Sequence, residues 1–113
     1  MSENCLFCKI IKGEIPCDKL YEDEDVFAFR DIAPQAPMHV LIIPKEHLRG
    51  PEAVGEANER VMGKLMRVAN EIAGKEGQTD YRLVCNNGAV AGQTVFHLHM
   101  HIIGGRPLGW PPG

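Results

Sequence analysis

The segment His97–Ile103 constrains the fold of this chain more than any other stretch, because histidine occupies every second position and apolar residues fill the gaps. Side chains on a β-strand alternate between its two faces. On a strand, the imidazoles of His97, His99 and His101 therefore share one face. The opposite face is formed by Phe96, Leu98, Met100 and Ile102. A helix, at about 100° per residue, would scatter both sets. The segment thus predicts a strand with an apolar core face and a face of three imidazoles.

The rest of the pattern predicts an α+β fold in a single domain, residues 1–113. The length of 113 residues, with 44% hydrophobic and 24% charged residues, is typical of one globular domain. Apolar residues at helical spacing predict a short helix over Leu6–Ile11 and one long helix over Asn58–Ala73. The predicted strands are Lys19–Glu22, Val26–Arg30, His39–Ile43, Arg82–Asn86 and Val95–Ile103. Strands joined by short turns favour a five-stranded antiparallel sheet with the long helix on one face.

Charge and hydropathy exclude several classes of partner. The net charge is -3 and the chain has no run of Lys or Arg, so we expect no nucleic-acid partner. The most apolar run, Val40–Ile43, is too short to span a bilayer, and Met1–Asn4 lacks the start of a secretory signal. We therefore expect a cytoplasmic protein with no membrane partner. In that compartment its four cysteines are thiols or metal ligands rather than a disulfide framework.

Three imidazoles on one strand face indicate a functional site, because each partly buried ring needs hydrogen-bond partners. One alternative is a solvated face that tolerates histidine, and another is a three-histidine zinc site. Alternate residues on a strand lie about 6.6 Å apart, so they converge on one ion less readily than ligands from different elements. Beside a phosphate, the central His99 suits a nucleophile, and a neighbouring imidazolium can stabilise negative charge or donate a proton.

A glycine-bearing stretch lies upstream of the histidines. Between Gly88 and Gly92 the backbone N–H groups can approach phosphate oxygens, and the Thr94 hydroxyl adds a donor after Gln93. An ordinary hairpin connection is the alternative interpretation.

These residues resemble the histidine triad family, whose motif is His-x-His-x-His followed by two apolar residues. The likeness extends to the branch of histidine triad nucleotide-binding proteins and runs over nearly the whole chain. It is carried by Arg30–His39, Ile43–His47, Asn86, Gly92–Thr94 and the ending Trp110–Gly113. The resemblance implies a homodimer in which two five-stranded sheets join into one, with a purine nucleoside monophosphate site on each subunit.

The resemblance also implies a role for particular residues. Asp31 would hold the ribose hydroxyls and Ile32 would line the base pocket, with Phe7, Ile10 and Phe29 as further apolar walls. Phosphate or leaving-group contacts would come from Asn86, Gly92, Gln93 and Thr94. His99 would be transiently nucleotidylated, His101 would bind the α-phosphate, and His39 would orient the nucleophile from the adjacent strand.

The implied reaction is hydrolysis of a purine nucleoside phosphoramidate through a covalent nucleotidyl-histidine, with no cofactor needed for the chemistry. Related branches that transfer nucleotides or split dinucleoside polyphosphates carry Gln at the third position, which is His101 here. Thr94 replaces the usual Ser, and Gly109 replaces a bulkier residue. The alternatives are a dinucleoside polyphosphate hydrolase or nucleotidyl transferase, a binding module without catalysis, and zinc handling by the triad.

Cys5 and Cys8 indicate a metal site, because their two-residue gap lets two thiolates share a zinc ion. Family members with this pair complete the site with the counterparts of His47 and His97, which implies a closed structural zinc site. If zinc captures His97, catalysis rests on His99, His101 and His39. Two unrelated thiols remain an alternative. A thioredoxin-type pair should follow a strand, and almost nothing precedes Cys5.

Overall fold

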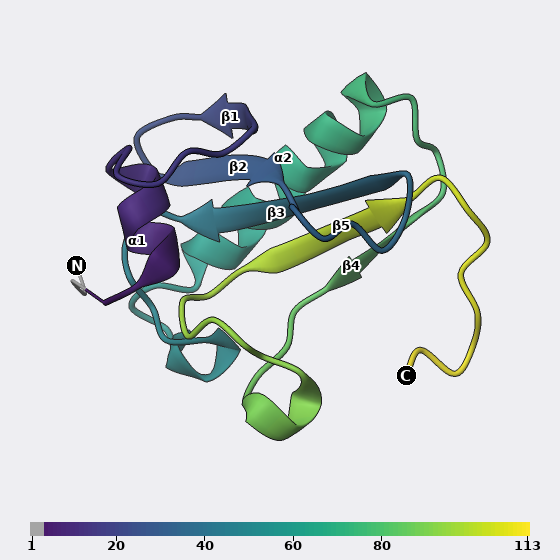
Figure 1. Cartoon of the computed structure of the whole chain (residues 1–113). Coiled ribbons are helices and arrows are strands. Elements are labelled where there is room, and N and C mark those ends of the chain that lie inside the picture. Colours follow the sequence, from purple (N-terminus) through teal and green to yellow (C-terminus); the bar gives the residue numbers. More distant parts are fainter. Residues whose placement is uncertain (1–3) are drawn as a thin grey trace.

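Five antiparallel strands form one sheet in the order β1-β2-β3-β5-β4. The structure is a computed structural model that describes residues 4–113. Its helices are α1 (Leu6–Ile11), α2 (Arg60–Lys75) and the 3-10 turns η1 (Pro51–Ala53) and η2 (Ala89–Ala91). Its strands are β1 (Lys19–Glu22), β2 (Val26–Arg30), β3 (Met38–Pro44), β4 (Tyr81–Val84) and β5 (Met100–Gly104). The predicted α+β class, with a five-stranded antiparallel sheet, a long helix and a short N-terminal helix, is confirmed (Figure 1).

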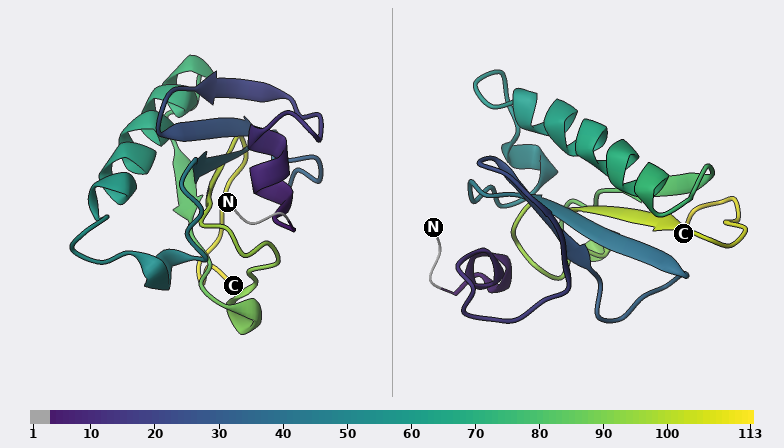
Figure 2. Two further views of the ribbon diagram at one scale, coloured as in Figure 1. Left: turned by 90° about the vertical axis from the view of Figure 1, so that its left-hand side faces the viewer. Right: turned by 90° about the horizontal axis from the view of Figure 1, so that it is seen from above.

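Helices α1 and α2 lie on opposite sides of the sheet (Figure 2). An apolar cluster lies between the sheet and each helix. Every residue of the central strand β3 is buried, and its side chains alternate between the clusters. Val40 and Ile42 belong to the cluster under α2, whereas Leu41 and Ile43 belong to the cluster that contains α1. The α2 face therefore forms the larger core, and the opposite face is left to α1 and the histidines.

The long helix α2 is amphipathic as predicted. It begins and ends two residues later than the predicted Asn58–Ala73. The Asn58 side chain accepts from the Gly55 N–H and donates to the Ala53 carbonyl, which holds this residue in the preceding turn. At the other end the helix continues to Lys75. Across residues 4–113 we find no helix with the length and apolar character that crossing a membrane requires.

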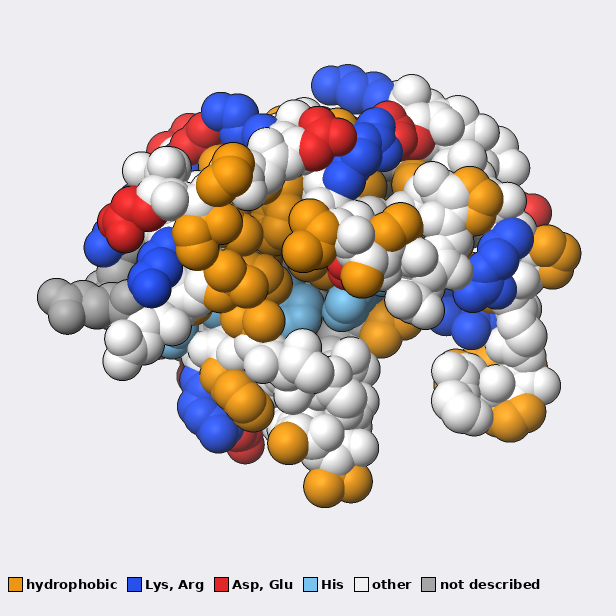
Figure 3. All heavy atoms as spheres, viewed as in Figure 1, with side chains coloured by type: hydrophobic (Ala, Val, Ile, Leu, Met, Phe, Trp, Pro, Cys, Tyr) orange, Lys and Arg blue, Asp and Glu red, His pale blue; other side chains and the backbone are white. Residues whose placement is uncertain are grey.

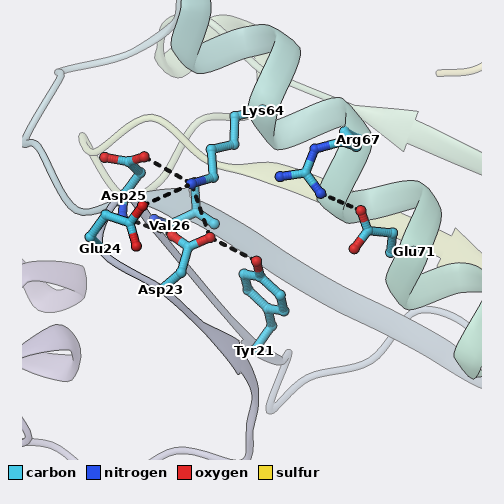
Figure 4. Close-up of polar contacts among 8 residues, drawn as sticks. All are labelled: Tyr21, Asp23, Glu24, Asp25, Val26, Lys64, Arg67 and Glu71. Carbon is cyan, nitrogen blue, oxygen red and sulfur yellow. Dashed lines mark hydrogen bonds and ion pairs between the residues drawn. The ribbon is translucent and has the colours of Figure 1, made fainter.

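Lys64 ties α2 to the turn between β1 and β2 (Figure 4). Its Nζ lies 3.0 Å from the Asp23 carboxylate and 2.8 Å from that of Asp25. Burial alone would raise the pKa of Asp23, but hydrogen bonds from Tyr21, two backbone N–H groups and Lys64 hold it well below its ordinary value. The turn is therefore anchored on the helix that covers the core.

Two predicted strands were too long at one end. The last strand begins at Met100 rather than Val95, because the preceding residues leave the sheet and the Leu98 N–H donates to the Leu48 carbonyl. Phe96 does not join the core; it is 38% exposed and stacks under the Arg49 guanidinium, 4.8 Å from its ring centroid. The fourth strand, predicted as Arg82–Asn86, ends at Val84.

Candidate functional site

The site lies on the α1 side of the sheet, around the start of β5. His101 stands in β5 opposite Leu41 of β3, and His39 stands on β3 beside it. The rings of His99 and His101 are 5.1 Å apart, as are those of His39 and His101. Regular pairing of the central strands thus positions two imidazoles, and the segment leading into β5 adds the third.

The ring of His99 has a defined tautomer. Its Nδ1 lies 2.7 Å from the carbonyl oxygen of His97, and a carbonyl can only accept a hydrogen bond. Nδ1 therefore carries the proton, and Nε2 keeps its lone pair. The Phe7 ring meets His99 edge on, with centroids 5.1 Å apart. His99 is thus an oriented imidazole in which Nε2, opposite the anchored side, is the nitrogen placed to act as nucleophile.

His39 and His101 form a hydrogen-bonded chain with a fixed direction. The Gln35 N–H donates to Nδ1 of His39 at 3.0 Å, so the ring proton of a neutral His39 is on Nε2. Nε2 donates to Nδ1 of His101 at 2.8 Å, which leaves His101 with its proton on Nε2. His39 was expected to orient the nucleophile, but it contacts His101 instead. These two hydrogen bonds leave Nε2 of His101 as an N–H donor.

Burial favours the neutral forms of His39 and His101. Burial and, to a smaller extent, the neighbouring His99 and His39 together lower the pKa of His101 to about 4, against the opposing effect of Asp31. Burial also lowers the pKa of His39, although the Asp31 carboxylate, 3.3 Å from Nε2, acts in the opposite direction. Near pH 7, His101 therefore offers an N–H donor rather than a full positive charge.

A cavity of about 240 Å³ opens beside these rings. Eight of the residues predicted to bind nucleotide line it: Phe7, Ile10, Phe29, Asp31, Ile32, Thr94, His99 and His101. The sequence interpretation missed six other lining residues: Leu6, Ile15, Pro16, Cys17, Leu41 and Val95. Strand alternation from His39 could have identified Leu41. Figure 3 shows histidine side chains at the bottom of a hollow bordered by apolar ones.

Three predicted phosphate ligands lie outside the lining of this cavity. Both N–H bonds of the Gln93 amide are engaged, at 2.8 Å from the Arg49 carbonyl and 3.1 Å from the Val95 carbonyl. Its Oε1 accepts from the Gly88 N–H. Gly92 has φ +102°, a conformation that favours glycine, and lies against the Asn86 amide. In this structure Gln93 braces the glycine-bearing loop.

The first histidine of the triad points elsewhere. The Nδ1 of His97 lies 3.3 Å from Sγ of Cys5 and 3.2 Å from Nδ1 of His47, which is 3.4 Å from Sγ of Cys8. We call these four residues the Cys/His cluster. His97 is fully buried in it, and its other nitrogen, Nε2, donates to the Pro44 carbonyl at 2.8 Å. His97 therefore lies with the ligand set that the resemblance implied and does not line the cavity beside His99 and His101.

The Cys/His cluster has the donor chemistry of a tetrahedral zinc site. One sulfur or nitrogen atom from each residue lies within 4.8 Å of the others. Because Nε2 of His97 holds the ring proton, its Nδ1 presents a lone pair toward the cluster, as in metal sites with a carbonyl in the outer shell. Two thiolates and two neutral imidazoles match the preference of zinc. The residues present fit this metal.

A second group of candidate ligand atoms, on Asp31, His39 and His101, is equally close together. It does not fit a metal in the arrangement described. Nδ1 of His39 already accepts the Gln35 N–H, so Nε2 of the neutral ring bears a proton and has no lone pair to give. This group is a hydrogen-bond chain.

Known proteins share both the fold and the sequence of this chain. A family model described as HIT domain matches residues 12–108. The purine nucleoside phosphoramidase of Escherichia coli (strain K12) is 48% identical over 96% of this chain and 93% of its own length. The 14 kDa zinc-binding protein of Zea mays is 50% identical over 96% and 87%, respectively. A HIT family hydrolase from Legionella pneumophila superposes with a TM-score of 0.94 at 46% identity, covering 97% of this chain and 100% of the other.

The fold is thus that of the HIT proteins to which the chain is similar. The chain belongs to the HIT domain family.

The titration of His101 leads to a prediction about stability. Its pKa is 6.5 in an unperturbed chain and about 4 when folded, so between these values the unfolded state binds more protons. The free energy of unfolding should therefore fall as the pH drops from about 6.5 to about 4. His101→Gln should lose less stability over this interval than the wild type. Urea unfolding at several pH values measures this; equal losses in both proteins would contradict it.

Proposed function

We propose that this protein hydrolyses the P–N bond of purine nucleoside phosphoramidates, releasing a nucleoside monophosphate and an amine. The tautomer of His99 carries the proposal, since its unprotonated Nε2 lies in a cavity with the donor His101. The apolar residues Phe7, Ile10 and Phe29 suit a base, and the Asp31 carboxylate suits ribose hydroxyls. The name of the Escherichia coli relative supports this reaction class.

The reaction has two displacement steps. In the first, the Nε2 lone pair of His99 forms a bond to phosphorus, and the P–N bond of the substrate breaks with its electron pair on the departing nitrogen. That nitrogen takes a proton from solvent and leaves as the amine. In the second, water attacks phosphorus, the bond to His99 breaks, and the water proton leaves to solvent. The Nε2–H of His101 and the Thr94 hydroxyl would donate to phosphate oxygens in both steps.

A dinucleoside polyphosphate hydrolase is the alternative function, since only the leaving group differs. His101 favours the phosphoramidase, because the resembling branches that split dinucleoside polyphosphates carry Gln at this position. Four cysteines that form no disulfide within the described residues suit a reducing, cytoplasmic compartment.

The covalent step predicts a specific defect in His99→Ala. The wild type mixed with an adenosine phosphoramidate and quenched rapidly should show an added nucleotidyl mass on His99. His99→Ala should lose that adduct, and kcat should fall about 10³-fold or more, because the lost interaction belongs to the chemical step. AMP should still bind, which calorimetry checks. Turnover by His99→Ala at the wild-type rate would exclude the covalent mechanism.

We further propose one structural zinc ion per chain, held by Cys5, Cys8, His47 and His97. When bound, zinc would cross-link the N-terminal segment to the sheet. It would take no part in the reaction. The name of the Zea mays relative supports zinc binding.

Elemental analysis tests the zinc site. Wild type should contain one zinc per chain, and Cys5→Ser should lose most of it, because a hydroxyl is a much poorer zinc ligand than a thiolate. Cys17→Ser is the matched control, since Cys17 lines the cavity but lies outside the Cys/His cluster. A wild type without zinc after growth and dialysis in zinc would reject the site.

We also propose a homodimer in which the sheets of two copies join along β4. The other edge strand, β1, is unsuited to pairing, because it carries the charged Lys19 and Glu22 and an irregular register. The β4 edge is half-buried and includes Leu83 and Val84. Sedimentation equilibrium should therefore give about twice the chain mass of 12.5 kDa. The mass of one chain at micromolar concentration would argue against the dimer.

A further inference from the structure

Helix α1 connects the Cys/His cluster to the nucleotide cavity. Cys5 caps its N-terminus by accepting the Cys8 N–H, so both thiols lie at the start of the helix. Phe7 and Ile10 are also three positions apart, and they form a second stripe that lines the cavity. One stripe of this short helix therefore carries candidate metal ligands, and the other lines the proposed base pocket.

The helix depends on contacts outside itself. It has six residues, and helices this short are unstable alone because few hydrogen bonds offset the cost of nucleation. Its anchors are the thiols of the cluster and the packing of the buried Phe7, Cys8 and Ile10 against the sheet. Loss of the metal would remove the first anchor and leave the second.

Phe7 touches both sites with one ring. Its centroid is 5.9 Å from that of His97, a cluster residue, and 5.1 Å from that of His99, the proposed nucleophile. Its centroid is also 5.6 Å from that of Phe29, which lines the same cavity. All three contacts are edge to face, so a shift of α1 changes them together.

We propose that zinc binding at the Cys/His cluster and purine nucleotide binding in the cavity strengthen each other through α1, with Phe7 as the positioning residue. This inference rests on the proposed function. Zinc holds the Cys5 and Cys8 end of α1, which fixes the wall formed by Phe7 and Ile10 before the nucleotide arrives. The nucleotide packs against the same wall and so favours the position of α1 that zinc requires.

Calorimetry with AMP as the probe tests the coupling in both directions. The full-length chain loaded with zinc should bind AMP about tenfold more tightly than the chelator-stripped chain, within the usual range of coupling between two sites. Linkage requires saturating AMP to raise the zinc affinity by the same factor. Hydrogen exchange of the stripped chain should increase at α1 but not at β3, which shows that the fold is retained.

Two variants locate the coupling. Phe7→Ala keeps all four cluster ligands, so zinc should still bind, but AMP affinity should become nearly independent of zinc. A merely structural role for Phe7 would lower AMP affinity by the same factor with and without zinc. Lys9→Ala is the matched control, because Lys9 lies on α1 but is neither a cluster residue nor a cavity residue. It should keep the wild-type coupling.

The possible failures are distinguishable. Equal AMP affinity in the zinc-loaded and stripped chains overturns the coupling and leaves the proposed function standing. Unchanged coupling in Phe7→Ala overturns the role of Phe7. A chain that binds zinc but never binds AMP overturns the proposed function and this inference with it.

Discussion

The hydrogen bond from Nδ1 of His99 to the carbonyl of His97 is the interaction on which the rest of the site depends. It fixes the ring proton on the anchored side and leaves Nε2 as the only available lone pair. The two residues that form it stand just before β5, outside the regular pairing. A segment locked fully into the sheet would spend its carbonyls on the neighbouring strands, so the early departure from the sheet is part of the site.

The neighbouring imidazoles are differentiated by what their inner nitrogens contact. A backbone N–H sets the tautomer of His39, His39 sets that of His101, and a backbone carbonyl sets that of His99. Adjacent rings of the same residue type thereby become a nucleophile and a donor. Burial lowers the pKa of His101, so neither assignment requires a charged ring at neutral pH.

One face of the sheet carries the larger apolar core, and the other carries the candidate site. The face under α2 is closed by buried apolar residues and by the Lys64 ion pairs. The face under α1 carries polar rings, a cavity and a helix of one and a half turns. A short helix cannot seal such a face by packing alone, which gives the Cys/His cluster a physical reason to exist.

The sequence by itself determined the fold class and most of the site's membership. Period-two alternation places Leu98, Met100 and Ile102 on the core side of the sheet and the histidines on the other, and helical spacing identified α2. Local pattern could not show that His97 turns to the thiols or that His39 contacts His101. It also missed Ile15 and Cys17 in the cavity and placed Phe96 in the core. Those outcomes depend on contacts between residues far apart in the sequence, 62 positions for His39 and His101 and 92 for Cys5 and His97. Only the folded chain decides which nitrogen meets which partner.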